Sequence, residues 1–225
     1  MPVLEGPVST LLGEVGLGVS VPLHTTDRPW PWKEFGQVQG HYRVVGRFNL
    51  VASQAAASNF WAFRVSNPRT VIVPTRYEVR WTQTGNVTAA IRHTTHLYKM
   101  RNFTAIPTGN SQILTPSSKR TVMGPPTIEC RCLVAAGASA GMSGGTGGGV
   151  APISQMDKWF LLTLDTAARP VPTVKEMLDD VNGTHPFTLA QNEGLMLTND
   201  QVAVFGAIHS SSMTVDFSYA EVLAS

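Results

Sequence analysis

The stretch TRYEVRWTQ (75–83) alternates aromatic or aliphatic side chains with charged ones at a period of two residues. Successive side chains of an extended strand point to opposite faces of a sheet, so one face of this segment would be apolar and the other charged. The stretch SMTVDFSYAEV (212–222) repeats the pattern. Both stretches predict strands of an antiparallel sheet with one face in a hydrophobic core.

Short alternating or apolar runs continue in both directions from this stretch, separated by turn-forming residues such as Thr-Gly-Asn. The other strands that we predict are 41–51, 59–65, 70–73, 87–100, 128–135, 158–164, 186–190, 194–198 and 201–207. Many short strands with frequent turns are typical of a sandwich or a jelly roll. We therefore predict an all-β fold, an antiparallel β-sandwich or jelly-roll-like domain, over residues 39–225.

Residues 1–38 are rich in glycine and proline, unlike the rest of the chain. Proline lacks an N–H and pushes the preceding residue into extended geometry, so DRPWPWKEFG (27–36) cannot form a regular helix or an interior strand. We predict an extended N-terminal arm in which Trp30, Trp32 and Phe35 anchor a partner protein. The alternative, that these aromatics cover the edge of the domain's own core, stays open.

Two connecting segments have distinctive compositions. In PTVKEMLDDVNG (172–183), Thr173 and Glu176 have capping-box spacing and Gly183 could end a helix, so we predict one short connector helix there. GASAGMSGGTGGG (137–149) holds seven glycines among 13 residues, which predicts a flexible surface loop.

The composition indicates a surface with few charges. Charged residues make up 14% of the chain, against about 25% in typical domains. Five of the 17 basic residues are lysine, leaving 12 arginines, and interfaces are enriched in arginine. A bias of the genome would explain the same excess. The arginines are spread over several predicted strands instead of clustering on one element, so we expect no nucleic-acid binding.

Three short motifs suggest chemistry, but their context argues against it. GMSGG (141–145) matches the nucleophile elbow, yet no helix can follow Ser143 through TGGGVAP, so we expect no nucleophile there. The histidines of HTTH (93–96) would face opposite sides of a strand, which excludes a shared metal. Cys130 and Cys132 are separated by one residue, where a disulfide would be strained, so we predict free thiols.

In LAQNEGLML (189–197), Glu193 is the one carboxylate between two apolar runs. The neighbouring Asn192 and Gly194 reach left-handed backbone conformations at little cost, so we predict a tight turn. The carboxylate would lie in water or accept a bond from a nearby backbone N–H, with nothing to make it a general acid. We predict no catalytic, cofactor-binding or metal-binding residue, no enzyme activity and, for want of an apolar span of roughly 18 residues, no membrane contact.

The second half of the chain also resembles a known family. The segments that carry the resemblance are PFTLAQNEGLMLTND (186–200), MTVDFSYAEV (213–222), TRYEVRWTQTGNVTAA (75–90), HLYKMRNFTAIPTGNSQILTPSSKRT (96–121) and MDKWFLLTLDT (156–166). Together they resemble a family of tailed-bacteriophage virion proteins that end in a similar LAQNEGL…YAEV pattern, over roughly residues 65–223. The resemblance implies a structural protein of the particle. No functional residue is carried over, because the matching positions look like strand cores and turns.

The resemblance and the composition together lead us to expect a capsid decoration or cement protein on the head surface of the virion, made in the host cytoplasm. Its expected partners are the major capsid protein and copies of itself, as a homotrimer, with no cofactor and no small-molecule ligand. The alternative is a carbohydrate- or receptor-binding module on a tail or head fibre, which would need exposed aromatic side chains. Trp61, Trp81 and Trp159 lie in strand patterns, and we predict that they are core residues.

Overall fold

The computed structural model shows an all-β domain. It describes residues 38–51, 54–55, 57–83, 92–118, 126–145, 156–165, 173–176, 188–199 and 211–223. Its strands are β1 (Val38–Leu50), β2 (Asn59–Val65), β3 (Thr70–Gln83), β4 (Arg92–Met100), β5 (Ser111–Ile113), β6 (Ser117–Ser118), β7 (Ile128–Leu133), β8 (Met156–Asp165), β9 (Thr173–Glu176), β10 (Gly194–Asn199) and β11 (Ser211–Leu223). No helix occurs within these ranges. The predicted all-β class is confirmed.

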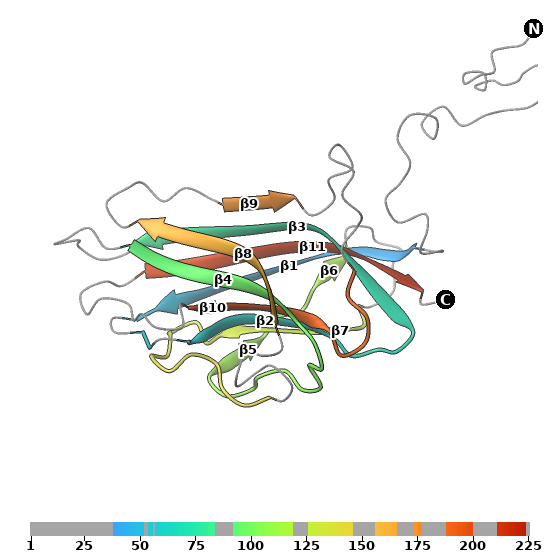
Figure 1. The fold of residues 1–225 in the computed structure, drawn as a ribbon, viewed down its shortest axis with the longest axis horizontal. Helices are drawn as coiled ribbons and strands as arrows, with labels where there is room; N and C mark the ends of the chain where they lie inside the picture. Colours follow the sequence, from blue (N-terminus) through green and yellow to red (C-terminus); the bar gives the residue numbers. More distant parts are fainter. Residues whose placement is uncertain are drawn as a thin grey trace, which may run out of the picture. The chain divides into compact units, whose positions relative to one another are not determined.

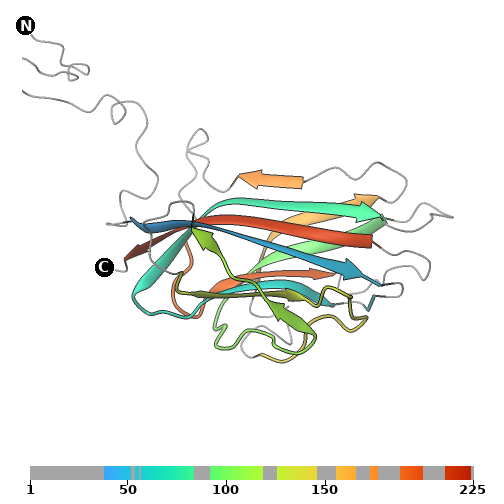
Figure 2. The same cartoon turned by 180° about the vertical axis from the view of Figure 1, so that it is seen from behind.

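The strands form two antiparallel sheets (Figures 1 and 2). The five-stranded sheet has the order β6-β1-β11-β3-β9, and the six-stranded sheet has the order β5-β7-β2-β10-β4-β8. Four pairs are nested along the chain: β1 with β11, β2 with β10, β3 with β9, and β4 with β8. The three remaining strands lie beyond these pairs. Strand β6 extends the five-stranded sheet beside β1, and β7 and β5 extend the six-stranded sheet beside β2. The arrangement is an antiparallel sandwich, as predicted.

The core lies between the two sheets and is rich in aromatic side chains. Phe217 of β11 contacts rings from both sheets, with centroid distances of 4.8 Å to Phe63, 5.6 Å to Trp61 and 6.0 Å to Tyr77. All four side chains are fully buried. Full burial of one such side chain contributes about 1.5–3 kcal/mol to folding. The apolar side chains of residues 75–83 and 212–222 therefore face the core, as their period of two residues predicts.

The predicted placement of the tryptophans is confirmed where side chains are described. Trp61 is completely buried and Trp81 is 3% exposed. Trp159 lies in strand β8, as its pattern predicts, although its side chain lies outside the described part of the structure.

Strand β3 joins two segments that the sequence separates at Pro74. The register with β11 shifts between Ser218 and Tyr219: Ser218 lies opposite Arg76, while Tyr219 lies opposite Pro74. Thr75 is therefore an extra residue in β3. Proline cannot donate to a sheet ladder and is accommodated at such irregularities, so the strand continues across it.

The predicted helix over 172–183 is wrong at its start. Thr173–Glu176 form strand β9, which pairs with β3 from Val79↔Thr173 to Arg76↔Glu176. The edge of β3 gives these residues backbone hydrogen-bond partners, and this tertiary pairing outweighs the weak local signal of the capping box. Residues 177–183 lie outside the described residues. Of the predicted strand 186–190, the described residues 188–190 contribute an isolated bridge between Leu189 and Ile72.

The first part of the glycine-rich loop contacts the six-stranded sheet. Met142 is 3% exposed and bridges Asn59, and Ser143 bridges Gly109. Left-handed φ angles at four glycines between residues 137 and 145 allow the chain to follow this path. Residues 146–149 and the predicted arm, apart from Val38, lie outside the described residues, so the flexibility of the loop and the role of the arm stay predictions.

Candidate functional site: a charged face on the five-stranded sheet

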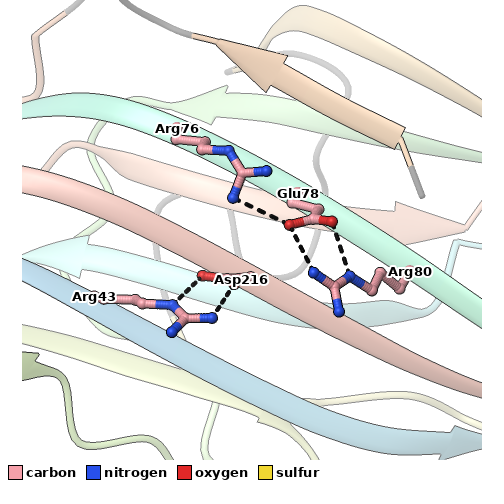
Figure 3. A network of polar contacts seen from close by, with 5 residues as sticks. All are labelled: Arg43, Arg76, Glu78, Arg80 and Asp216. Atoms are coloured by element: carbon pink, nitrogen blue, oxygen red, sulfur yellow. Dashed lines mark hydrogen bonds and ion pairs between the residues drawn. The ribbon is translucent and has the colours of Figure 1, made fainter.

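The outward-facing side chains of β1, β11 and β3 form the most highly charged surface that the structure describes. We call this surface the charged face, and its arginines and carboxylates are Arg43, Arg47, Arg76, Glu78, Arg80 and Asp216. Asp216 lies opposite Val45 on β1 and opposite Glu78 on β3, so the three strands bring the two carboxylates side by side. Figure 3 shows Arg43, Arg76 and Arg80 beside these carboxylates.

Asp216 is bound by the guanidinium of Arg43. Nε of Arg43 donates to Oδ1 at 2.9 Å, and Nη2 donates to Oδ2 at 2.5 Å. The aspartate side chain is only 7% exposed, whereas the arginine side chain is 53% exposed. The hydrogen bond from Arg43 lowers the pKa of Asp216, against the opposing effect of burial. This fork geometry fixes the plane of the arginine.

Glu78 is bound in the same way by two arginines of its own strand. Arg80 donates from Nε to Oε2 at 2.8 Å and from Nη2 to Oε1 at 3.2 Å, and Arg76 Nη1 lies 3.1 Å from Oε1. The glutamate side chain is 3% exposed and that of Arg80 is 59% exposed. The hydrogen bond from Arg80 is the main cause that lowers the pKa of Glu78.

The charged face therefore presents guanidinium groups to its surroundings. Its carboxylates lie beneath the arginine side chains and are almost inaccessible. Four arginines against two carboxylates give a formal charge of +2. Val45, which is 46% exposed, adds an apolar spot among them. Exposed arginine around an apolar residue is typical of protein interfaces.

We expect Asp216→Asn to lower the free energy of unfolding at neutral pH by about 1–2 kcal/mol, because it removes a charge-assisted fork to a half-exposed arginine. The native pKa of Asp216 is lowered, so its contribution is present above the unfolded pKa of about 3.9 and is lost as the pH falls through the native value. The difference in the free energy of unfolding between the wild type and Asp216→Asn should therefore shrink below about pH 4. Urea unfolding at several pH values measures it, and a difference that stays constant down to about pH 2 would contradict the ion-pair origin.

Glu193 turns the chain, as the sequence predicts. Asn192 has φ +61°, and Glu193 Oε2 accepts a hydrogen bond from the N–H of Ala190 at 3.0 Å. Oε1 of the same carboxylate lies 3.3 Å from Nζ of Lys99 and 3.7 Å from Nη1 of Arg101. The carboxylate is thus held by one backbone amide and two cations, which the sequence alone does not reveal.

Ser143 and His96, the other candidate residues whose side chains are described, lie on different segments of the fold. Ser143 is exposed at its bridge with Gly109. His96 is buried in β4, with Nδ1 2.7 Å from the hydroxyl of Tyr98, while the side chain of His93 lies outside the described residues. Within the described ranges, no three His, Cys, Asp or Glu side chains are grouped to hold a metal ion.

Both cysteines are free, as predicted, and the structure shows that both are buried. Burial raises the pKa of Cys132 to about 11 and that of Cys130 well above its usual range. Both thiols are therefore protonated at neutral pH and are poor nucleophiles.

A cleft of about 360 Å³ opens beside β5 and β7. Its lining is Ile113, Leu114, Thr115, Pro116, Pro126, Ile128, Glu129, Cys130 and Arg131. The two charged members already have partners: Glu129 is paired with Arg64, and Arg131 Nη1 donates to Ser111 Oγ at 2.9 Å. The cleft thus has a largely apolar lining and two charged side chains that already have partners.

The predicted arm anchors, Trp30, Trp32 and Phe35, lie outside the described residues, so the structure does not place them near the charged face or anywhere else. The described ranges contain no helix of the length and hydropathy needed to cross a membrane. Neither the models of known protein families nor the curated protein sequences give a match to this chain.

Proposed function

We propose that the protein is a structural virion protein of a tailed phage, of the capsid decoration or cement type, built on a jelly roll. The nested strand pairing is the observation that carries the proposal. It adds to the resemblance of residues 65–223 to tailed-phage virion proteins, which was noted from the sequence alone.

The strand order supports the proposed jelly roll. If a long antiparallel ribbon is wound around a barrel, successive pairs of strands fall alternately in two sheets. Here β1 with β11 and β3 with β9 lie in one sheet, and β2 with β10 and β4 with β8 lie in the other. Jelly rolls of eight strands occur in viral capsid and lectin domains. A fold alone does not assign a function, and the resemblance favours the virion.

The described structure suits a load-bearing role. Its large aromatic side chains are used in one core shared by the two sheets, and the charged face offers a broad, rigid surface for another protein. A cement protein would bridge neighbouring shell subunits through such surfaces. We also propose that the protein acts as a homotrimer and that Trp30, Trp32 and Phe35 of the arm reach adjoining subunits. Extended segments cover a large area per residue, although they lose entropy when they bind.

The carbohydrate-binding alternative has less support from the same structure. Stacking on a sugar ring needs an exposed aromatic side chain, but Trp61 and Trp81 are buried. Among the side chains that the structure describes, the large exposed hydrophobic ones are Val45 and Ile113, both aliphatic. We therefore favour the decoration protein over the fibre module.

Purified heads separated from their tails test the proposal. We expect mass spectrometry to find the protein in the head fraction, in a constant ratio to the major capsid protein. A known tail protein must be absent from that fraction as a control on the separation. Detection of the protein only in the tail fraction would overturn the head assignment, and its absence from the particle would overturn the virion assignment.

A further inference from the structure

We infer that the charged face docks a surface of a different protein that carries carboxylates around an apolar residue. That the partner is a shell subunit rests on the proposed function, whereas the chemistry of the face does not. The face supplies three components of such an interface: oriented cations, an apolar centre and a small net positive charge.

The cations are oriented before any partner arrives. A guanidinium has five N–H donors, and both Arg43 and Arg80 use Nε and Nη2 to bind the carboxylates beneath them. More than half of each side chain stays exposed, so the donors outside these ion pairs are available for a second carboxylate. Because the planes are already fixed, less side-chain entropy is lost on binding.

The apolar centre lies on β1. Val45 projects between Arg43 and Arg47, on the same face of the strand, and Arg47 is exposed. Thr214 of β11 lies opposite Arg47 on one side and Arg80 on the other. Arg43 and Arg47 thus flank a spot where an apolar side chain of a partner would exclude water from the new ion pairs.

The composition of the face favours an acidic protein over nucleic acid. A duplex is bound through many cations that neutralise phosphates, whereas here two of the six charges are carboxylates. The exposed Val45 would also have no counterpart on a phosphate backbone. Accordingly, the partner chemistry that fits is carboxylate and aliphatic, a combination that protein surfaces provide.

The partner is also a different protein instead of a second copy. The carboxylates whose side chains the structure describes already have partners: Glu78, Glu129, Glu193 and Asp216 with basic side chains, and Glu221 with the backbone N–H and hydroxyl of Thr127. A second copy that met the charged face through any of these described carboxylates would have to break one of these contacts. A partner with unpaired carboxylates binds without that cost.

The inference is tested with isotope-labelled protein and an oligoglutamate peptide at low salt, followed by backbone amide shifts. We expect the peptide to perturb amides of β1, β11 and β3. Arg47→Glu should weaken its binding by about tenfold or more, because a favourable ion pair becomes a repulsive one. Thr214→Glu should weaken the binding of the peptide to a similar extent. The new carboxylate would form ion pairs with Arg47 and Arg80, which lie opposite position 214, and would compete with the peptide for them. Arg69→Glu, the same charge change at an exposed turn residue, is the matched control and should leave binding unchanged.

Several results would overturn the inference. These are shifts outside the three strands, no binding, an equal loss in the Arg69 control, tighter binding of a short DNA duplex, or self-association of the wild type that Arg47→Glu abolishes. Thermal melting of each variant ensures that a loss is not caused by unfolding. Binding of wild-type protein to head shells that lack it is measured separately. Failure there would count against the proposed function, while the peptide experiment decides the chemistry of the face on its own.

Discussion

Phe217→Ala should lower the free energy of unfolding by about 3–5 kcal/mol, the usual cost of truncating a buried phenylalanine. Phe217 is completely buried, and its ring lies between Phe63 and Trp61 of the six-stranded sheet and Tyr77 of its own sheet. Alanine would leave a cavity where the two sheets meet, and the T-shaped contacts with all three rings would be lost. Denaturant unfolding measures the change, and a fall in Tm of roughly 6–20 °C should accompany it.

The control for this substitution is Phe217→Leu, which keeps most of the apolar volume and should cost clearly less than alanine. Thr214→Ala on the same strand tests a position outside the core and should change stability by about 0.5 kcal/mol or less. A cost for Phe217→Ala below about 1 kcal/mol would mean that the ring does not join the two sheets as the structure shows.

The second large effect is expected at Gly194, the first residue of β10. A Cβ at this position would lie 2.0 Å from the carbonyl oxygen of Phe63 and 2.8 Å from Cδ1 of Phe103. The oxygen belongs to the backbone of β2, with which β10 pairs, so it cannot move unless the two strands separate. We expect Gly194→Ala to cost about 3 kcal/mol, at the upper end of the range for overpacking. Hydrogen exchange should increase first in the amides that join β2 and β10.

Gly144→Ala separates this clash from backbone strain. Gly144 has φ +79° and no atom within 4 Å of the position of its Cβ, so alanine there should cost only the left-handed conformation, about 1–2 kcal/mol. Chemical denaturation of the two variants side by side gives the comparison. If Gly194→Ala costs no more than Gly144→Ala, the close approach of β10 to β2 is wrong.

The strands were predictable because burial on one face imposes a period of two residues on the sequence. Residues 59–65 match β2 at both ends, and 212–222 lies within β11. The turn at Glu193 was also predictable, because it depends on the residues next to it in the sequence. Asn192 takes the left-handed backbone conformation that such a turn needs. Strand β9 was not predictable, because its four residues are fixed by the edge of β3 and not by their own preference.

Only part of the charged face could be predicted from the sequence. The period of two places Arg76, Glu78 and Arg80 on one side of β3, so their ion pairs could be expected from the sequence alone. The pair between Arg43 and Asp216 joins residues 173 positions apart and depends on which strands are neighbours. Periodicity does not determine strand order, and for the same reason it gave no sign that both carboxylates are buried on the outer face.

The position of β11 has a consequence for how the protein forms in the cell. It is the last of the described strands along the chain but the middle strand of its sheet, where it separates β1 from β3. During translation, the edges of β1 and β3 that pair with β11 in the folded sheet therefore stay unpaired until residues 211–223 leave the ribosome. Contacts between such distant parts of a chain slow folding, and open edges in the nascent chain are prone to wrong pairing. Chaperones that shield these edges would therefore have their greatest effect before residues 211–223 have left the ribosome.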